Sequence, residues 1–258
     1  MNQNLDQSKP IKRQIYFASS SKAKLNQLYQ IMESDNSVLL NQISKEKIKY
    51  NSSLYCTDIE WIHVSVDIDE IQSMSNTIVA NDKIHKVYEY VKNKYLIENF
   101  ELVCEDTGYS YANMNGFPGA LIRYYHDSIG NQGICKFHGN MRAANISVVM
   151  YTNGTNTIQF TGKTFGIVPD KPRPVLGQYK YISSELDTVF IPDYPDELVE
   201  WEGFAYSEIP ANIKNIVSAR GQALSHLKDY LITESKQKLI TKIKNYLIVK
   251  LNNNYITN

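Results

Sequence analysis

The chain has 258 residues, which is enough for one large domain or two small ones with a substantial hydrophobic core. Its 27 Lys and Arg balance 27 Asp and Glu, which argues against a nucleic-acid-binding protein that works by bulk electrostatics. The three cysteines lack Cys-x-x-Cys spacing, which argues against a zinc ribbon or a disulfide framework. No apolar run approaches the length of a membrane span, so we expect a cytoplasmic protein that binds neither nucleic acid nor membrane.

The first recognisable pattern is a short strand at 14–18, followed by the hydroxyl-rich turn Ser19 to Ser21 and by apolar residues at helical spacing after Lys24. This layout suits phosphate binding, because the first N–H groups of a helix lack partners and the helix dipole is positive there. The alternative is that the serines only cap the helix and Lys24 is solvated. The local sequence by itself favours that simpler alternative.

Residues 34–60 show no clear pattern, but the alternating segment that follows predicts a strand ending in Asp67, Asp69 and Glu70. Three acids in four positions are typical of a solvated turn. Only a second carboxylate site nearby would make them metal ligands. The segment 78–95 then has apolar residues at helical spacing and predicts an amphipathic helix.

The most informative stretch is 101–125, where a short apolar run ends in two adjacent carboxylates, Glu105 and Asp106. An apolar run closed by glycine predicts a buried strand that ends at these acids. In open α/β sheets, ligands collect at the C-terminal ends of strands. Carboxylates at such an end are poorly placed for packing and well placed to hold a hard cation such as Mg²⁺.

Further along, 145–151 and 157–164 alternate on either side of an Asn-Gly turn and predict a β-hairpin. The Pro-rich segment 169–176 indicates a loop. Residues 186–192 predict a short strand, with Asp187 exposed near its start.

The last predicted helix spans 219–231 and has Ser218 as its natural N-cap. Arg220 would lie in the first turn, which is unfavourable against the helix dipole unless an anion occupies the site. The mismatch therefore points toward phosphate. Residues 232–258 follow as a basic, amphipathic extension.

Together these motifs resemble the inosine triphosphate pyrophosphatase family, also called Ham1-like, over about residues 15–230. Five family motifs occur in the family's order: F-A-S-S-S-K-A-K at 17–24, D-I-D-E-I-Q at 67–72, E-D-T-G with N-G-F-P-G at 105–119, F-T-G with G-I at 160–167, and K-N-I-V-S-A-R at 214–220. Each motif is weak alone, and the E-D-T-G stretch is the most specific.

The resemblance implies an α/β fold with an elongated mixed central β-sheet, flanking helices and two lobes around a nucleotide cleft. The pyrophosphatase domain would span 14–231, between a flexible tail at 1–13 and the extension at 232–258. It implies a homodimer that uses Mg²⁺ to hydrolyse non-canonical purine nucleoside triphosphates, such as ITP, dITP or XTP, to monophosphate and pyrophosphate.

The resemblance also implies roles for individual residues. Glu70 and Asp106 would be the metal ligands, and Asp106 would also activate water. The residues that would bind the substrate are Ser19, Ser21, Lys24, Thr107, Asp187, Lys214 and Arg220. Lys83 lies near a lysine of the family's helix but matches it only with a one-residue gap.

The sequence departs from the family pattern at Ser21, Ser184, Leu186, Val189 and Ala219. Most of these changes fall where the family holds the base, so we expect an altered base preference. Tyr179 or Tyr181 could supply a replacement ring. Two alternatives remain: a catalytically inactive nucleotide-binding relative, and a Maf-like pyrophosphatase acting on other modified nucleotides.

Overall fold

The computed structural model describes residues 12–34, 59–176 and 184–256. Tyr179 and Tyr181, the possible replacement rings, lie outside the described residues, as do most of the predicted N-terminal tail and of the 34–60 segment.

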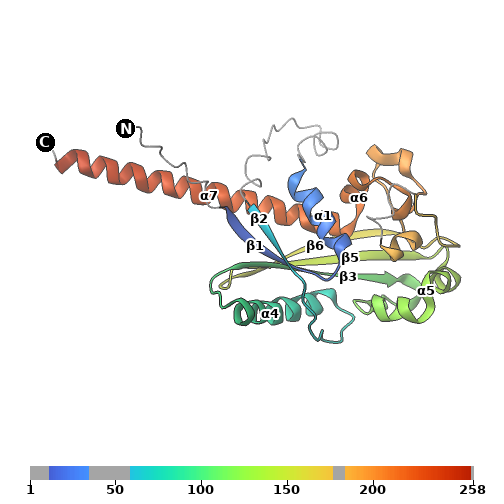
Figure 1. Cartoon of the computed structure of the whole chain (residues 1–258). Coiled ribbons are helices and arrows are strands. Elements are labelled where there is room, and N and C mark those ends of the chain that lie inside the picture. The colour runs from blue at the N-terminus through green and yellow to red at the C-terminus, as the bar shows by residue number, and fades with distance from the viewer. Residues whose placement is uncertain (1–11, 35–58, 177–183, 257–258) are drawn as a thin grey trace, which may run out of the picture.

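A mixed seven-stranded sheet runs through the molecule in the order β2-β1-β3-β5-β6-β7, and β4 pairs with β3 off this path (Figure 1). Its strands are β1 (Arg13–Ala18), β2 (Ile59–Val64), β3 (Glu101–Tyr111), β4 (Pro118–Gly119), β5 (Arg142–Thr152), β6 (Thr157–Ile167) and β7 (Ile191–Pro192). The first three run parallel and the others pair antiparallel. The predicted β-hairpin is confirmed as β5 and β6, which pair over their whole length.

Helices flank both faces of this sheet, and the expected mixed α/β fold is therefore confirmed. In Figure 1, α4 covers one face, α1 and α7 lie on the other, and α5 and α6 gather at one end. The helices are α1 (Lys22–Glu33), α4 (Asn76–Tyr95), α5 (Ile122–His138), α6 (Ala211–Val217) and α7 (Ala219–Ile256). Short 3-10 helices are η1 (Ala112–Met114), η3 (Glu185–Val189), η4 (Asp196–Trp201) and η5 (Tyr206–Glu208).

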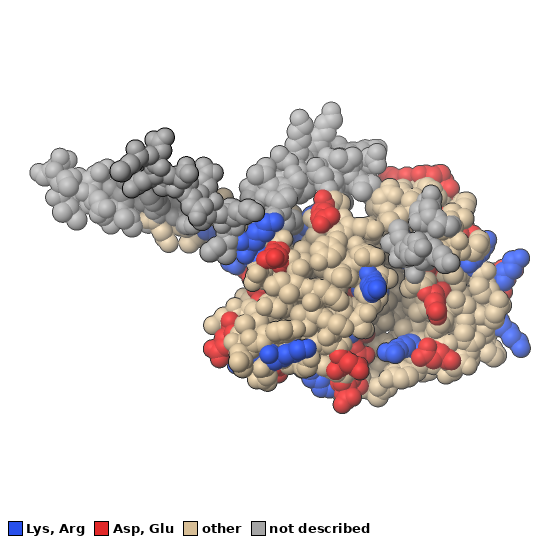
Figure 2. All heavy atoms as spheres, in the orientation of Figure 1, with Lys and Arg blue, Asp and Glu red and all other residues tan. Residues whose placement is uncertain are grey.

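The last helix is longer than predicted, because α7 continues without a break from the predicted 219–231 segment through the extension to Ile256. Its predicted cap is confirmed, since the Gly221 N–H donates a hydrogen bond to Ser218 Oγ at 3.1 Å. None of the helices among the described residues is long and apolar enough to cross a membrane. On the face shown in Figure 2, acidic and basic side chains are interspersed, in keeping with the neutral composition.

The prediction that the central strand ends at Glu105 and Asp106 was wrong. β3 continues to Tyr111 and pairs with β5 along this whole length, so both acids lie in mid-strand. Gly108 does not terminate the strand. A Cβ atom there would lie 2.5 Å from the Asn76 side chain, so glycine is required for close packing against α4.

One edge of β3 is nevertheless open at these acids. β1 stops at Ala18, opposite Cys104, and β4 begins its pairing at Tyr109. Between them, residues 105–108 of β3 have no neighbouring strand on that side among the described strands. The ligand-collecting position expected at a strand end is therefore supplied by the end of β1.

The segment predicted as a strand at 186–192 is mostly a 3-10 helix, and only Ile191 and Pro192 pair with β6. The chain turns because the Ser184 backbone N–H donates to Asp187 Oδ2 at 2.6 Å. A side chain that binds its own backbone in this way competes with strand pairing.

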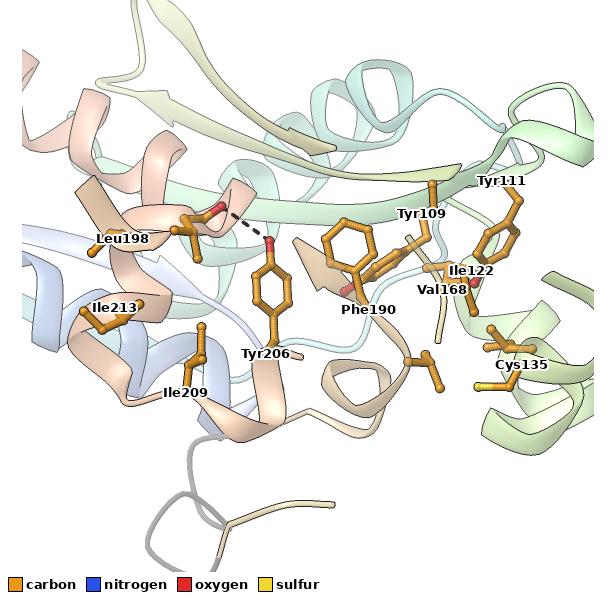
Figure 3. Close-up of a cluster of buried hydrophobic side chains, with 14 residues drawn as sticks. Tyr109, Tyr111, Ile122, Cys135, Val168, Phe190, Leu198, Tyr206, Ile209 and Ile213 are labelled. Atoms are coloured by element: carbon orange, nitrogen blue, oxygen red, sulfur yellow. Dashed lines mark hydrogen bonds between the residues drawn. The ribbon is translucent and has the colours of Figure 1, made fainter. Parts of the chain in front are cut away.

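Three buried clusters hold the fold together. One lies between the sheet and α1 with α7 and includes Val103, and a second lies between the sheet and α4 and includes Leu102 and Cys104. The third packs around Phe190 at the end of the sheet near α5 (Figure 3). Because successive strand residues point to opposite faces, Glu105 follows Val103 toward α1 and α7, whereas Asp106 follows Cys104 toward α4.

Candidate active site

A cavity of about 200 Å³ is bounded by α1, β3, η3, α6 and the start of α7. Six of the seven predicted substrate-binding residues line it: Ser21, Lys24, Thr107, Asp187, Lys214 and Arg220. The seventh, Ser19, is not among the lining residues and instead accepts a hydrogen bond from the Ser21 N–H at 3.1 Å. The structure thus brings together residues that are up to 199 positions apart in the sequence, from Ser21 to Arg220.

Glu105 lies behind this cavity and holds two of its cations. Glu105 is 2% exposed, and its carboxylate lies 2.5 Å from Lys24 Nζ and 3.1 Å from Arg220 Nε. Burial alone would raise the pKa of Glu105, but Arg220 and Lys24 hold it well below its usual range. Ser147 Oγ donates a further hydrogen bond at 2.7 Å. Glu105 is therefore the anion that offsets Arg220 in the first turn of α7.

Two sequence interpretations at α1 are resolved by these contacts. Ser21 does cap the helix, because its Oγ accepts a hydrogen bond from the Lys24 N–H at 3.4 Å. Lys24, however, is not the solvated lysine of the simpler alternative, since its ammonium group is paired with the buried Glu105.

Asp187 and Lys214 form a second ion pair in the cavity wall. The expectation that Asp187 is exposed was wrong: its side chain is buried, with 4% of the residue exposed. It is buried because it accepts the Ser184 N–H in η3 and Lys214 Nζ from α6. The same lysine lies 5.7 Å from the centre of the Tyr206 ring.

Asp106 occupies the other face of β3. It is 8% exposed, and Asn76 Nδ2, from the first turn of α4, donates to its Oδ2 at 2.7 Å. Burial raises the pKa of Asp106 to about 6, although Lys24 and Lys83 pull it in the opposite direction. An acid held in this way can exchange a proton near neutral pH.

Glu70, the other predicted metal ligand, forms an ion pair with Lys83 of α4, whose Nζ lies 2.6 Å from Glu70 Oε1. Burial alone would lower the pKa of Lys83, but the hydrogen bond and charge of Glu70 raise it, and Asp106 adds to the rise. Lys83 therefore pairs with Glu70, and its charge also acts on the pKa of Asp106. No sequence signal marked Asn76.

The two predicted metal ligands offer oxygen donors of the kind that Mg²⁺ prefers. Within residues 12–34, 59–176 and 184–256, no group of three or more His, Cys, Asp or Glu could hold a metal ion. Asp106 and Glu70 would thus suit Mg²⁺ only in a site completed by substrate phosphates, which is its usual mode in phosphate-transferring enzymes.

The departures from the family pattern have different surroundings. Ser184 and Leu186 line the cavity. Ala219 is fully buried and does not line it, because its backbone packs on β6 so closely that a Cβ at Gly162 would lie 1.9 Å from the Ala219 oxygen. Ser184 and Leu186, together with the third departure Ser21, therefore lie on the surface that a ligand would meet, whereas Ala219 does not.

Comparison with known proteins agrees with this architecture. The model of the Ham1 family matches residues 15–230, and the chain belongs to this family. Its similar relatives include the dITP/XTP pyrophosphatase of Methanopyrus kandleri, which is 31% identical over 67% of this chain and 83% of the relative. The dITP/XTP pyrophosphatase of Thermococcus kodakarensis is 30% identical over 67% of this chain and 84% of the relative.

Among solved structures, a HAM1 protein from Coxiella burnetii aligns with a TM-score of 0.58 and 18% identity, covering 85% of this chain and 98% of that one. The Staphylococcus aureus Ham1 protein aligns with a TM-score of 0.54 and 18% identity, covering 86% and 100%. These structures support the fold, and the α7 extension beyond residue 230 lies outside the family match.

Proposed function

We propose that this chain is a Mg²⁺-dependent nucleoside triphosphate pyrophosphohydrolase that converts a non-canonical purine nucleotide, such as ITP, dITP or XTP, to its monophosphate and pyrophosphate. The observation that carries the proposal is the open edge of β3 at 105–108. Cations for a triphosphate gather on one side of this edge, and the buried acid Asp106 lies on the other. The names of the relatives support the same reaction.

Lys24 is placed to act on both sides of the edge. Its Nζ lies 2.5 Å from the Glu105 carboxylate and 3.4 Å from the Glu105 carbonyl oxygen, and its charge lowers the pKa of Asp106. Lys24 and Arg220 would therefore hold the phosphate chain and stabilise the departing pyrophosphate. Thr107 Oγ1, which accepts a hydrogen bond from Arg220 at 3.0 Å, fixes the arginine in this position.

Asp106 is the group we assign to water activation. Its carboxylate is buried, held by a single amide donor, and has a pKa near neutrality, so it can accept a proton from water attacking phosphorus. Mg²⁺, held by Asp106 and Glu70, would neutralise phosphate charge and orient its oxygens. Lys83 pairs with Glu70 at 2.6 Å, and the charge of Asp106 also raises the pKa of Lys83.

We further propose an altered base preference, a homodimer and a cytoplasmic location. Leu186 and Ser184 line the cavity where the family has aromatic residues, so the wall offers less stacking surface to a purine. A base held with less stacking is discriminated less strongly.

The test is a panel of ordinary, deaminated and otherwise modified nucleoside triphosphates, assayed with Mg²⁺ for pyrophosphate release. We expect release from at least one deaminated purine nucleotide. Release only from modified pyrimidine nucleotides would favour the Maf-like alternative. Calorimetric nucleotide binding without any release would favour an inactive relative, and the proposal would then fail.

A further inference from the structure

Two polar side chains, Tyr109 on β3 and Asn145 on β5, face the cavity from the floor of the sheet. They lie directly opposite each other in the antiparallel register of these strands. Each is 4% exposed, and both line the cavity. Side chains opposite each other on one face of a sheet have Cβ atoms about 5 Å apart, so one ligand can reach both.

Neither side chain has its hydrogen-bonding capacity met within the described part of the chain. Asn145 Nδ2 donates to the Gly108 carbonyl at 3.2 Å, which fixes the amide and leaves its Oδ1 as an acceptor. The Tyr109 hydroxyl makes no hydrogen bond to any described residue. Some buried side-chain atoms are both closed off from solvent and without a hydrogen-bond partner, and the Tyr111 hydroxyl is one of them. The Tyr109 hydroxyl and Asn145 Oδ1 are not closed off in this way. Both therefore open into the cavity.

The Tyr109 ring is held rigidly. It packs edge-on against Phe190, with ring centres 5.4 Å apart and planes at 76°, and Figure 3 shows the two rings side by side. Burial raises the pKa of the hydroxyl well above its usual value, and Asp187 adds to the rise. The hydroxyl therefore keeps its proton and can donate as well as accept.

The position of the pair relative to the cations indicates which part of a nucleotide it would meet. Every second residue of a strand points to the same face, so the side chains of β3 on this face include Glu105, Thr107 and Tyr109. The first two contact Arg220, and Tyr109 lies two residues further on, about 6.8 Å along the strand. A ligand whose phosphates contact the cations would thus bring its nucleoside to Tyr109 and Asn145.

We propose that Tyr109 and Asn145 form a hydrogen-bonding subsite that reads the nucleoside, an inference that rests on the proposed function. Asn145 Oδ1 requires a donor, and Tyr109 accepts from or donates to the group beside it. The matching chemistry is an O–H or N–H donor next to an acceptor. Two parts of a 6-oxopurine nucleotide present it: the sugar hydroxyls, and the N–H and C=O edge of the base. Removing one buried partner of such a pair lowers discrimination, because the other is left unpaired.

The test compares Tyr109→Phe with Tyr111→Phe. Both substitutions remove one unpartnered hydroxyl from the same face of β3, but only Tyr109 lines the cavity. We expect Tyr109→Phe to lower kcat/KM for the preferred nucleotide about tenfold, the usual size of one lost hydrogen bond. We expect Tyr111→Phe to leave kcat/KM unchanged.

Three substrates distinguish whether the pair binds the sugar hydroxyls or the edge of the base. If the pair reads the sugar, Tyr109→Phe reduces the preference for ITP over dITP. If it reads the base, the variant reduces the preference for ITP over the triphosphate of purine riboside, which lacks the 6-oxygen. Asn145→Leu, of similar size, should change the same ratio. An equal loss for all three nucleotides, or a loss no larger than that of Tyr111→Phe, overturns the proposal.

A binding measurement tests the Tyr109–Asn145 subsite independently of the proposed enzymatic activity. Wild-type protein that releases no pyrophosphate would refute the activity, and calorimetric titration with IMP would then decide the subsite. A weaker affinity for IMP in Tyr109→Phe than in Tyr111→Phe supports it. Equal affinities in the two variants, or no IMP binding by the wild type, overturn it.

Discussion

Glu105 and Asp106 are neighbours in sequence, yet the two faces of β3 give them opposite surroundings. On one face, Glu105 meets two cations, which hold its pKa well below the usual range against the effect of burial. On the other, Asp106 has one amide donor, and burial raises its pKa to about 6. Because both are almost fully buried, the partners and not the burial separate their properties. The first carboxylate organises cations, and the second remains available to exchange a proton.

The largest effect should follow the loss of the Asp106 carboxylate. Asp106→Asn keeps the shape and the hydrogen bond from Asn76 but cannot accept a proton or bind a cation strongly. We expect kcat for the preferred nucleotide to fall by about 10³-fold, with KM changed far less. The measurement is pyrophosphate release at saturating substrate. Asp69→Asn, which changes an exposed acid in the turn before α4, should keep wild-type kcat, and a similar kcat in both variants would contradict the assignment.

Loss of the Glu105 carboxylate, on the other face of β3, should lower the free energy of unfolding. Glu105→Gln leaves Lys24 and Arg220 facing each other without a counter-charge, and we expect a loss of about 3 to 5 kcal/mol in the free energy of unfolding at pH 7. Because the pKa of Glu105 is lowered in the folded state, its contribution is present above the unfolded pKa of about 4.3 and is lost as the pH falls below it. The deficit should therefore shrink in acid.

The matched control for Glu105→Gln is Glu101→Gln, on the same strand and face. Its partner Arg13 keeps a second carboxylate, Glu234, at 2.5 Å. Urea unfolding should show the smaller loss for Glu101→Gln. A larger loss at Glu101 would mean that the cation pair does not depend on Glu105.

The smallest expected effect is a gain in the free energy of unfolding when the Asp106 carboxylate is removed, in contrast to the loss expected for Glu105→Gln. A carboxyl whose pKa rises from 3.8 to about 6 on folding binds more protons in the folded state, so its contribution becomes destabilising as the pH rises through that range. Asp106→Asn should therefore be more stable than the wild type at pH 8 by about 1 to 3 kcal/mol, and the gap should narrow toward pH 5. Urea unfolding in chelator-treated buffer measures it. A variant less stable than the wild type at pH 8 would contradict the raised pKa.

The parts of the fold that the sequence predicted correctly depend on local patterns. The Asn-Gly turn identified the β5–β6 hairpin, and the Ser218 hydroxyl marked the start of α7. The structure brings six of the seven substrate-binding candidates to one cavity, and their role in binding stays a prediction.

The parts that the sequence misjudged depend on distant partners. Gly108 marks close contact with Asn76, 32 positions earlier, and a glycine that admits a neighbour cannot be told from one that ends a strand. Asp187 is buried because Lys214, 27 residues later, neutralises it. The Tyr109–Asn145 pair depends on the strand register, which the alternating pattern does not give.

The gap between β1 and β4 leaves main-chain groups of β3 along 105–108 without a strand partner, and one of them, the Glu105 carbonyl, already accepts a hydrogen bond from Lys24. A side-chain contact disappears with a single codon change, whereas a peptide group is present whatever residue is encoded. Nucleotide recognition that used these unpaired backbone groups would therefore be buffered against mutation. The cavity wall at Ser184 and Leu186 consists of side chains and has no such protection, so under the proposed function it is where substitutions would change the nucleotide preference and leave the rest of the site intact.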